Sequence, residues 1–148
     1  MELNGEVMVK AARERVWSAL NDPAVLRACI PGCEEITDES PTVRQLRIMV
    51  KMGPVRARFR GRVTLSEVEP PRRCIMEFEG SGGAAGMASG VSQVVLFDAG
   101  EQTRVTYTVN AAVGGKLGQI GGRMVDASAK QLADQFFMAL REQLATAA

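Results

Sequence analysis

The chain has 148 residues, of which 46% are hydrophobic and 24% are charged, and its formal net charge is +1. This length and balance predict one globular domain over residues 1–148 and exclude a disordered chain. The net charge neither predicts nor excludes a partner bound by bulk electrostatics, so any charged surface must come from local arrangement. Histidine is absent, which excludes the commonest general base, the commonest zinc partner of cysteine and every Ser-His or Cys-His nucleophile pair.

The first part of the chain predicts one strand and two short helices. Residues 3–11 mix apolar and polar side chains with partial alternation, as strands do. In residues 11–22 the apolar positions share one helical face. A second helix follows over residues 22–29, with Asp22 as its cap and Pro23 at its first position, and Pro31-Gly32 stops it.

The middle of the chain has the period of two that is typical of strands. Strands are predicted over residues 44–52, 55–65, 72–80, 86–98 and 103–113. They are separated by Gly53-Pro54, by Pro70-Pro71 and by the run DAGEQ (98–102). Residues 34–38, which include three carboxylates, are interpreted as a solvated turn.

A long amphipathic helix is predicted from Lys116 or Leu117 to about Leu144. Its apolar residues recur on one helical face: Ile120, Met124, Leu132, Phe136, Leu140 and Leu144. Hairpin-connected strands followed by one such helix predict an α+β fold, in which a curved antiparallel sheet of six to seven strands wraps around the helix. A curved sheet around one helix tends to leave a cavity between them, and ligand sites favour such concave apolar spaces.

The run ACIPGCEEI (28–36) holds Cys29 and Cys33 around a Pro-Gly turn. A zinc or iron-sulfur site needs four ligands, and the chain offers no histidine and no second short cysteine pair. A redox dithiol is typically C-x-x-C at a helix N-terminus, where the dipole favours a thiolate. No metal site is therefore predicted, and both cysteines are interpreted as packing beside a turn. Cys74 is interpreted as a core residue of its strand.

Two glycine-rich runs, GSGGAAGMASG (80–90) and GGKLGQIGG (114–122), lack the context of nucleotide loops. The first precedes a strand instead of a helix, and the second has Asn110 and Leu117 where a phosphate-binding loop needs glycine and serine or threonine. Glycines within strands instead mark curvature or a close approach to the backbone. In a sheet around a cavity they also leave room for a ligand.

Four arginines alternate along one strand and share its outer face, and we call them the arginine row: Arg56, Arg58, Arg60 and Arg62. Two interpretations stay open. The row could pair with Glu77 and Glu79 on the next strand, or it could dock an acidic protein surface or anionic lipid headgroups. Nucleic acid is not expected as a partner, because no aromatic residues interleave with the arginines and the net charge is near zero.

Several runs together resemble one known family: LNDPAVLRACIPGCEEI (20–36), GPVRARFRGRVTLSEVEPPRR (53–73), GSGGAAG (80–86) and VGGKLGQIGGRMVDASAKQLADQFF (113–137). They resemble the G-subunit family of carbon monoxide dehydrogenase, which belongs to the START/Bet v 1-like (SRPBCC) helix-grip superfamily. The resemblance covers nearly the whole chain. It implies the helix-grip form of the α+β fold predicted above.

The resemblance also implies an accessory protein instead of a catalytic one. Such proteins are encoded with molybdenum hydroxylases such as aerobic carbon monoxide dehydrogenase, whose subunits are the expected partners. They help to recruit the dehydrogenase to the membrane, and a hydrophobic cavity holding a quinone-like molecule fits delivery of electrons. No tightly bound cofactor is expected, and the expected ligand is a quinone or another lipid.

The expected location is the cytoplasm, with peripheral contact at the inner face of the cytoplasmic membrane. The N-terminus lacks the apolar core of a signal peptide, and no apolar run approaches the roughly 18 residues needed to span a bilayer. Two features depart from the family pattern. Longer relatives carry a C-terminal linker and anchor, whereas this sequence ends at LATAA. Relatives often have an aromatic residue where Cys74 stands, so the pocket is expected to be enlarged or repacked there.

The leading hypothesis is a non-enzymatic carrier with an apolar pocket and no catalytic residues. Leu26 and Ile30 are placed at its mouth, and the remaining lining residues are predicted to be Phe59, Phe78, Leu96, Tyr107, Ile120, Met124 and Phe136.

Two alternatives stay open beside the carrier. One is a cyclase- or hydratase-type enzyme that uses Tyr107 and a carboxylate at the mouth, chosen from Glu34, Glu35 and Asp38. The other is an adaptor with a filled core that docks through the arginine row, which a domain without a cavity of roughly 300 Å³ would favour.

Overall fold

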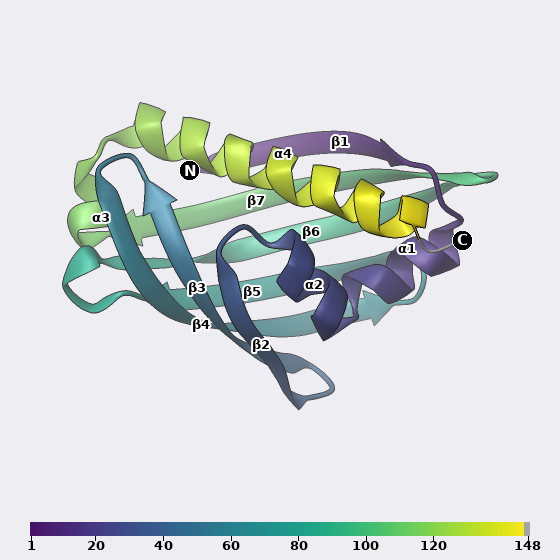
Figure 1. The fold of residues 1–148 in the computed structure, drawn as a ribbon, viewed down its shortest axis with the longest axis horizontal. Helices are drawn as coiled ribbons and strands as arrows, with labels where there is room; N and C mark the ends of the chain where they lie inside the picture. Colours follow the sequence, from purple (N-terminus) through teal and green to yellow (C-terminus); the bar gives the residue numbers. More distant parts are fainter. Residues whose placement is uncertain (147–148) are drawn as a thin grey trace.

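A seven-stranded antiparallel sheet curves around one long helix (Figure 1). The computed structural model describes residues 1–146. The strands, which lie in the order β1-β7-β6-β5-β4-β3-β2, are β1 (Glu2–Val9), β2 (Cys33–Ser40), β3 (Val43–Met52), β4 (Val55–Glu69), β5 (Arg73–Ser81), β6 (Met87–Ala99) and β7 (Gln102–Gly114). The helices are α1 (Arg13–Leu20), α2 (Pro23–Cys29), the short 3-10 helix η1 (Gly83–Ala85), α3 (Gly115–Gln119) and α4 (Gly122–Thr146). The predicted α+β helix-grip fold is confirmed.

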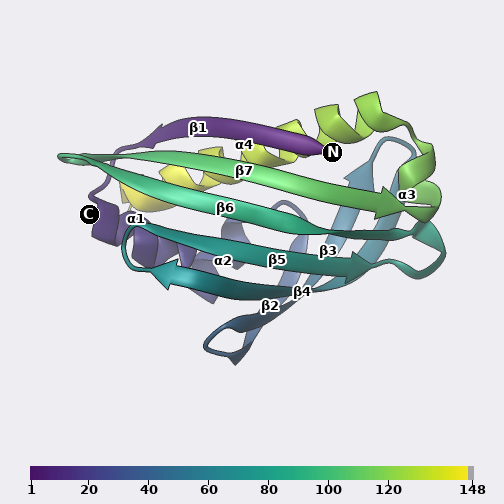
Figure 2. The ribbon, with the colours of Figure 1, turned by 180° about the vertical axis from the view of Figure 1, so that it is seen from behind.

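The helices cover one face of the sheet. Helix α4 runs along the inner face, and α1 and α2 lie beside its C-terminal half (Figure 1). The view from behind shows the outer face of β4, β5 and β6 without a helix over it (Figure 2). Inner-face side chains are therefore the ones that can enclose a ligand, whereas outer-face side chains meet solvent.

The predicted alternation decides which side chains face inward. Ile48 of β3 lies opposite Phe59 of β4, and Met49 lies opposite Arg58 in the next register position. The first pair belongs to the inner face and the second to the outer face, because successive residues of a strand point to opposite sides. The arginine row is thus on the outer face, as predicted.

The interior holds two groups of buried apolar side chains. The first lies between α1, the second half of α4 and the strands β1, β6 and β7: Val9, Ala11, Val16, Ala19, Cys29, Leu96, Val105, Tyr107, Phe137, Leu140 and Leu144. The second lies between the β3–β4 hairpin, α3 and the start of α4: Met52, Val55, Phe59, Leu117 and Val125. We call them the first and second core clusters. They mark the two ends of the space between sheet and helix.

Two elements differ from the sequence prediction. Residues 34–38 belong to strand β2 instead of a turn, and this edge strand pairs only with β3. Its one buried side chain is Ile36, so the strand carries little apolar signal. The predicted helix from residue 116 to 144 is two helices, because Gly121 between α3 and α4 has φ of 94°, outside the helical region.

Candidate functional site

An apolar cavity of about 230 Å³ lies between the inner face of the sheet and the helices α1, α2 and α4. Arg44 is its only charged lining residue and Asn21 is the only amide. A cavity of about 150 Å³ is enough to hold benzene, so this space admits a fused two-ring molecule. The lining residues are Trp17, Leu20, Asn21, Leu26, Ile30, Ile36, Arg44, Leu46, Val63, Leu65, Cys74, Met76, Val94, Phe136 and Phe137.

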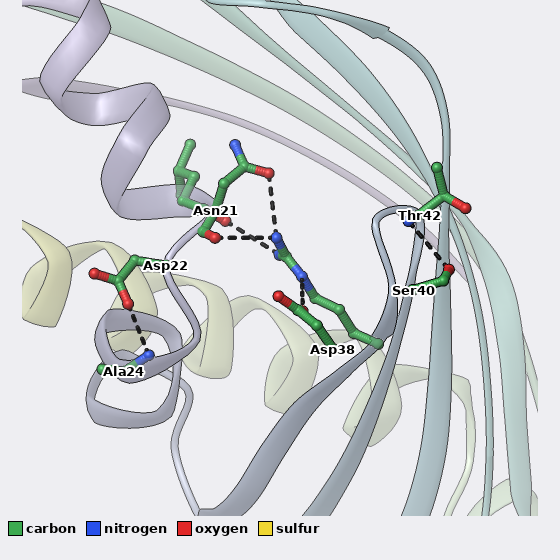
Figure 3. Close-up of polar contacts among 8 residues, drawn as sticks. Asn21, Asp22, Ala24, Asp38, Ser40 and Thr42 are labelled. Atoms are coloured by element: carbon green, nitrogen blue, oxygen red, sulfur yellow. Dashed lines mark hydrogen bonds and ion pairs between the residues drawn. The ribbon is translucent and has the colours of Figure 1, made fainter.

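The junction of α1 and α2 forms one wall of the cavity. Helix α1 ends at Leu20, and Nδ2 of the next residue, Asn21, donates to the carbonyl oxygen of Trp17 at 2.9 Å. Asp22 then caps α2 by accepting from the backbone N–H of Ala24 at 2.9 Å (Figure 3), and Pro23 occupies the first helical turn. The predicted cap and proline start are confirmed. These local bonds fix where Trp17 and Leu26 meet the cavity.

Arg44 holds this junction to the sheet. Its Nε donates to Oδ1 of Asp38 at 3.0 Å, and its Nη2 donates to the backbone oxygen and Oδ1 of Asn21 at 3.1 and 3.3 Å (Figure 3). Its Nη1 donates to the carbonyl oxygen of Leu20 at 3.4 Å. A cation at the C-terminus of α1 also interacts favourably with the helix dipole.

Arg44 was not predicted as a site residue, although the sequence holds a signal for it. It stands two residues before the apolar Leu46 in the predicted strand 44–52, so the two side chains share one face of that strand. An arginine in the inward register of an amphipathic strand is unusual, because a buried charge needs partners. The residue is 9% exposed. Asp38 stands opposite it in the β2–β3 hairpin and was missed because β2 was not predicted as a strand, whereas Asn21 is too distant in sequence to be recognised without the fold.

Cys74 of β5 faces the same cavity. Burial raises the pKa of its thiol, and the nearby Arg44 charge acts in the opposite direction. The thiol is therefore protonated at neutral pH, so it acts as a small, weakly polar part of the wall. The departure from the family pattern at this position thus falls in the cavity lining.

The family model of the carbon monoxide dehydrogenase G subunit (CoxG) matches residues 5–145. The chain belongs to the CoxG family. Membership of this family is consistent with an accessory role. No curated protein matches the sequence significantly.

Solved structures share the fold of this CoxG family member. A conserved protein from Geobacillus kaustophilus is 29% identical with a TM-score of 0.92, covering 98% of this chain and 95% of its own. A START superfamily protein from Mycobacterium smegmatis is 15% identical with a TM-score of 0.78, covering 99% of each chain. Zhui aromatase/cyclase from Streptomyces sp. R1128 is 17% identical with a TM-score of 0.70, covering 97% of this chain and 92% of its own.

Three of the nine predicted pocket residues line the cavity of this family member: Leu26, Ile30 and Phe136. Two others, Leu96 and Tyr107, lie in the first core cluster. The Tyr107 ring stacks on Phe137 with the ring centroids 5.1 Å apart. It also lies over Gly5, where an added Cβ would stand 2.2 Å from the tyrosine oxygen. The missing side chain of Gly5 thus makes room for Tyr107 and not for a ligand.

The other four predicted residues lie outside the cavity lining. Phe59 and Ile120 pack in and against the second core cluster, and Met124 is 43% exposed beside the Gly53 turn. Phe78 is half-buried near Gly90. The prediction treated the interior as one continuous pocket, whereas the second core cluster fills one end of it.

The three carboxylates weighed as mouth acids form ion pairs with arginines. Glu34 accepts from Nε and Nη2 of Arg58 at 2.6 and 3.0 Å, and these bonds hold its pKa below the ordinary value. Glu35 pairs with Arg47 at 2.7 Å and Asp38 pairs with Arg44 at 3.0 Å. None of the three carboxylates lines the cavity.

The arginine row is only partly neutralised. Arg58 pairs with Glu34, and Arg62 pairs with Glu39 at 3.0 Å. Both acids come from β2 instead of β5, so the expected pairing with Glu77 and Glu79 is wrong. The reason is that long arginine side chains reach across β3, where Met49 and Gln45 stand opposite Arg58 and Arg62 without competing charge. Among residues 1–146, Arg56 and Arg60 have no ion-pair partner.

An open groove of about 650 Å³ lies close to the cavity, although the two linings share no residue. Pro31 and Gln135 line the groove, and their chain neighbours Ile30 and Phe136 line the cavity. Cys33 also borders the groove, whereas Cys29 is 2% exposed in the first core cluster. Burial raises the pKa of both thiols. The cysteines therefore flank a turn whose Gly32 has φ of 77° and whose carbonyl accepts from the backbone N–H of Met49 at 2.8 Å.

The described part of the chain has neither a metal site nor a membrane-spanning helix. No group of three or more histidine, cysteine, aspartate or glutamate side chains within residues 1–146 is arranged to hold a metal ion. None of the helices in the same range is long and apolar enough to cross a membrane.

Proposed function

We propose that this chain binds a compact, ring-bearing apolar molecule, such as the head group of a quinone, as an accessory protein of a molybdenum hydroxylase of the carbon monoxide dehydrogenase kind. The observation that carries the proposal is the apolar cavity. A liquid water molecule occupies about 30 Å³, so a space of about 230 Å³ far exceeds a packing defect. Membership of the CoxG family supports the accessory role.

The size of the cavity limits the ligand. Drug-sized ligands occupy pockets of roughly 300 to 1,000 Å³, and about 230 Å³ lies below that range. A fused two-ring head group therefore fits, whereas a whole lipid does not. The tail of a larger ligand would leave between Ile30 and Phe136 into the nearby groove. This volume is also below the limit of roughly 300 Å³ that was set for the adaptor alternative, so size alone favours an adaptor. We still propose a carrier, because the space holds several water volumes and its lining is almost wholly apolar.

The single tryptophan of the chain lines the cavity and reports directly on its contents. Titration with 2,3-dimethyl-1,4-naphthoquinone should quench Trp17 fluorescence in a saturable way, and native mass spectrometry should detect co-purified ligand. The two methyl groups block addition of Cys74 to the quinone ring, so the titration reports binding alone. If quenching is not saturable and no small molecule co-purifies, the proposal fails.

The partner role is assigned to the outer face of the sheet. Arg56 and Arg60 are exposed cations without an ion pair among the described residues, so they can pair with acidic groups of the dehydrogenase. The Arg56→Glu/Arg60→Glu double variant should lose co-purification with the dehydrogenase when the proteins are co-expressed. The Lys116→Glu/Arg123→Glu variant changes the net charge equally on α3 and α4 and serves as control. Equal loss in both variants would reject a docking role for the arginine row.

We also propose that the ligand links the dehydrogenase to the cytoplasmic membrane, either by helping to recruit the enzyme or by helping to deliver its electrons. The apolar character of the cavity supports this role, because a quinone would otherwise stay in the bilayer. Sedimentation of the dehydrogenase with quinone-containing vesicles should depend on this chain. Equal sedimentation with and without the chain would contradict the recruiting role.

A cyclase- or hydratase-type activity is the less favoured function. The cyclase among the structural neighbours is 17% identical, which supports only the fold. General acid–base chemistry needs a titratable group within hydrogen-bond reach of the ligand. Tyr107 is packed in the first core cluster. Glu34, Glu35 and Asp38 form ion pairs with arginines, and none of the three carboxylates lines the cavity.

A further inference from the structure

We propose that Arg44 selects for an oxygen atom on the ligand, so that the cavity prefers a ring ketone or quinone to a hydrocarbon of the same shape. The carbonyl oxygen would accept a hydrogen bond from Nη1 of Arg44. This inference rests on the proposed function, because it concerns the ligand of the same cavity. The inference makes Arg44 the residue that determines which apolar molecules bind in the cavity.

The hydrogen-bond count of Arg44 leaves one donor free. A guanidinium carries five N–H groups, one on Nε and two on each terminal nitrogen. Nε donates to Asp38, and Nη2 donates twice to Asn21. Nη1 makes one bond, to the carbonyl oxygen of Leu20, and at 3.4 Å it is the longest of the four. One N–H of Nη1 therefore has no partner among residues 1–146.

That free donor belongs to a side chain that lines the cavity and is 10% exposed. A buried donor without a partner loses the hydrogen bonds that water would give it. The lining offers few other acceptors: apart from Asn21, whose Oδ1 already accepts from Nη2, and the weakly accepting sulfur atoms of Cys74 and Met76, the other lining side chains are aliphatic or aromatic. A ligand that brings an acceptor removes this cost, and a hydrocarbon does not.

The charge of Arg44 also acts inside the cavity. Burial raises the pKa of the Cys74 thiol, and the positive charge of Arg44 lowers it in part. A cation that influences one lining group across the cavity also influences the carbonyl dipole of a ligand beside it. The only carboxylate paired with Arg44, Asp38, has a side chain that is 47% exposed, so water screens it more than it screens the guanidinium.

A matched pair of probes tests the proposal: 2,3-dimethyl-1,4-naphthoquinone and 2,3-dimethylnaphthalene. Dissociation constants of both are measured by ¹H–¹⁵N NMR titration for the native chain, for Arg44→Met and for Arg47→Met. Methionine keeps an unbranched apolar side chain and removes every donor. Arg47 is on the same strand but faces outward, where it pairs with Glu34 and Glu35, so its variant is the control.

A hydrogen bond to a charged donor predicts that Arg44→Met weakens quinone binding about tenfold or more. Hydrocarbon binding reports only on the wall that Arg44 holds, so it should weaken about fivefold less than quinone binding, and Arg47→Met should leave both constants unchanged. Equal weakening of both probes in Arg44→Met would show that Arg44 only holds the wall in place, and would overturn the proposal. Failure of both probes to bind the native chain would instead reject the proposed function.

A second measurement needs no variant. With ¹³C-labelled carbonyl groups, the infrared stretching band of the bound quinone should lie at lower frequency than in hexane, because a guanidinium donor weakens the C=O bond. A bound quinone whose two carbonyl bands match those in hexane would overturn the proposal even if Arg44→Met failed to fold.

Discussion

The two ends of the space between sheet and helix differ although the same helix and sheet enclose both. Around the start of α4, the second core cluster fills the interior with Phe59, Met52 and Leu117, each less than 9% exposed. Around the second half of α4, the inner face presents shorter side chains such as Val63, Cys74 and Val94, and a cavity of about 230 Å³ is left.

The difference shows that the helix-grip architecture alone does not produce a pocket. At the filled end, the β3–β4 hairpin bends onto α4, and Met124 lies against the Gly53 turn. At the hollow end, α1 and α2 form an additional wall that Arg44 ties to β3 and, through Asp38, to β2. A pocket arises where small inner-face residues meet a wall that is held by polar bonds and cannot collapse.

The largest effect is expected from breaking the filled end. Phe59→Ala should lower the free energy of unfolding by about 3–5 kcal/mol, because it removes a buried ring and leaves a cavity. Urea denaturation measures this loss. The quinone dissociation constant at the other end should change by less than about twofold. A strong loss of quinone binding would show that the two ends are coupled and not independent.

The second largest effect is expected from releasing the wall of the hollow end. Arg44→Met removes four hydrogen bonds of a charged group, which should lower the free energy of unfolding by about 2 kcal/mol. The cost stays below that of breaking a fully buried pair, because Asp38 is half exposed and is solvated by water when Arg44 is absent. Arg47→Met, on the exposed side of β3, should cost less than about 1 kcal/mol. Equal costs would mean that Arg44 does not hold the wall.

The fold was largely predictable because its signals are local. Period-two alternation gave β3 to β7, and the Asp22-Pro23 start gave α2. Strand β2 was missed because it is a polar edge strand with only Ile36 buried. The division between α3 and α4 was missed because the apolar residues Ile120 and Met124 keep helical spacing across Gly121, whose φ of 94° interrupts the backbone.

Cavity-lining residues could be predicted only where the fold class and the position of a residue along the chain together place it at the cavity. Leu26 and Ile30 flank the end of α2, so the fold class alone placed them at the cavity. Tyr107 and Leu96 also face inward, but inward residues of a strand can be either core or lining. Whether an inward residue is core or lining depends on which side chains of other elements pack against it. That is long-range packing, such as the stacking of Tyr107 on Phe137.

A smaller change in stability is expected from filling the hollow end. Cys74→Phe places an aromatic ring in the cavity. The free energy of unfolding should change by less than about 1.5 kcal/mol, because the added volume enters existing space. Quinone quenching of Trp17 should be lost. Cys29→Ser, which alters a core thiol outside the lining, is the control. Retained quinone binding in Cys74→Phe would contradict the assignment of this cavity as the ligand site.

The smallest effect is expected on the outer face, which belongs to neither end. The hydrogen bonds from Arg58 hold the pKa of Glu34 below its ordinary value, so the folded state binds fewer protons there than the unfolded state. This contribution to stability is complete above the ordinary glutamate pKa, about 4.3, and is lost as pH falls through the lowered folded pKa. Glu34→Gln should therefore flatten the decline of stability in acid. It should leave quinone binding at neutral pH unchanged.

Acid titration of thermal unfolding measures this difference, with Glu77→Gln as the matched control. Glu77 is also exposed on the outer face but has no ion pair within residues 1–146. Its variant should follow the native pH curve more closely than Glu34→Gln does. If Glu34→Gln also weakened quinone binding at neutral pH, the outer-face pairs would support the cavity wall through β2. The contrast between the two ends would then depend on the Glu34–Arg58 pair as well as on Arg44.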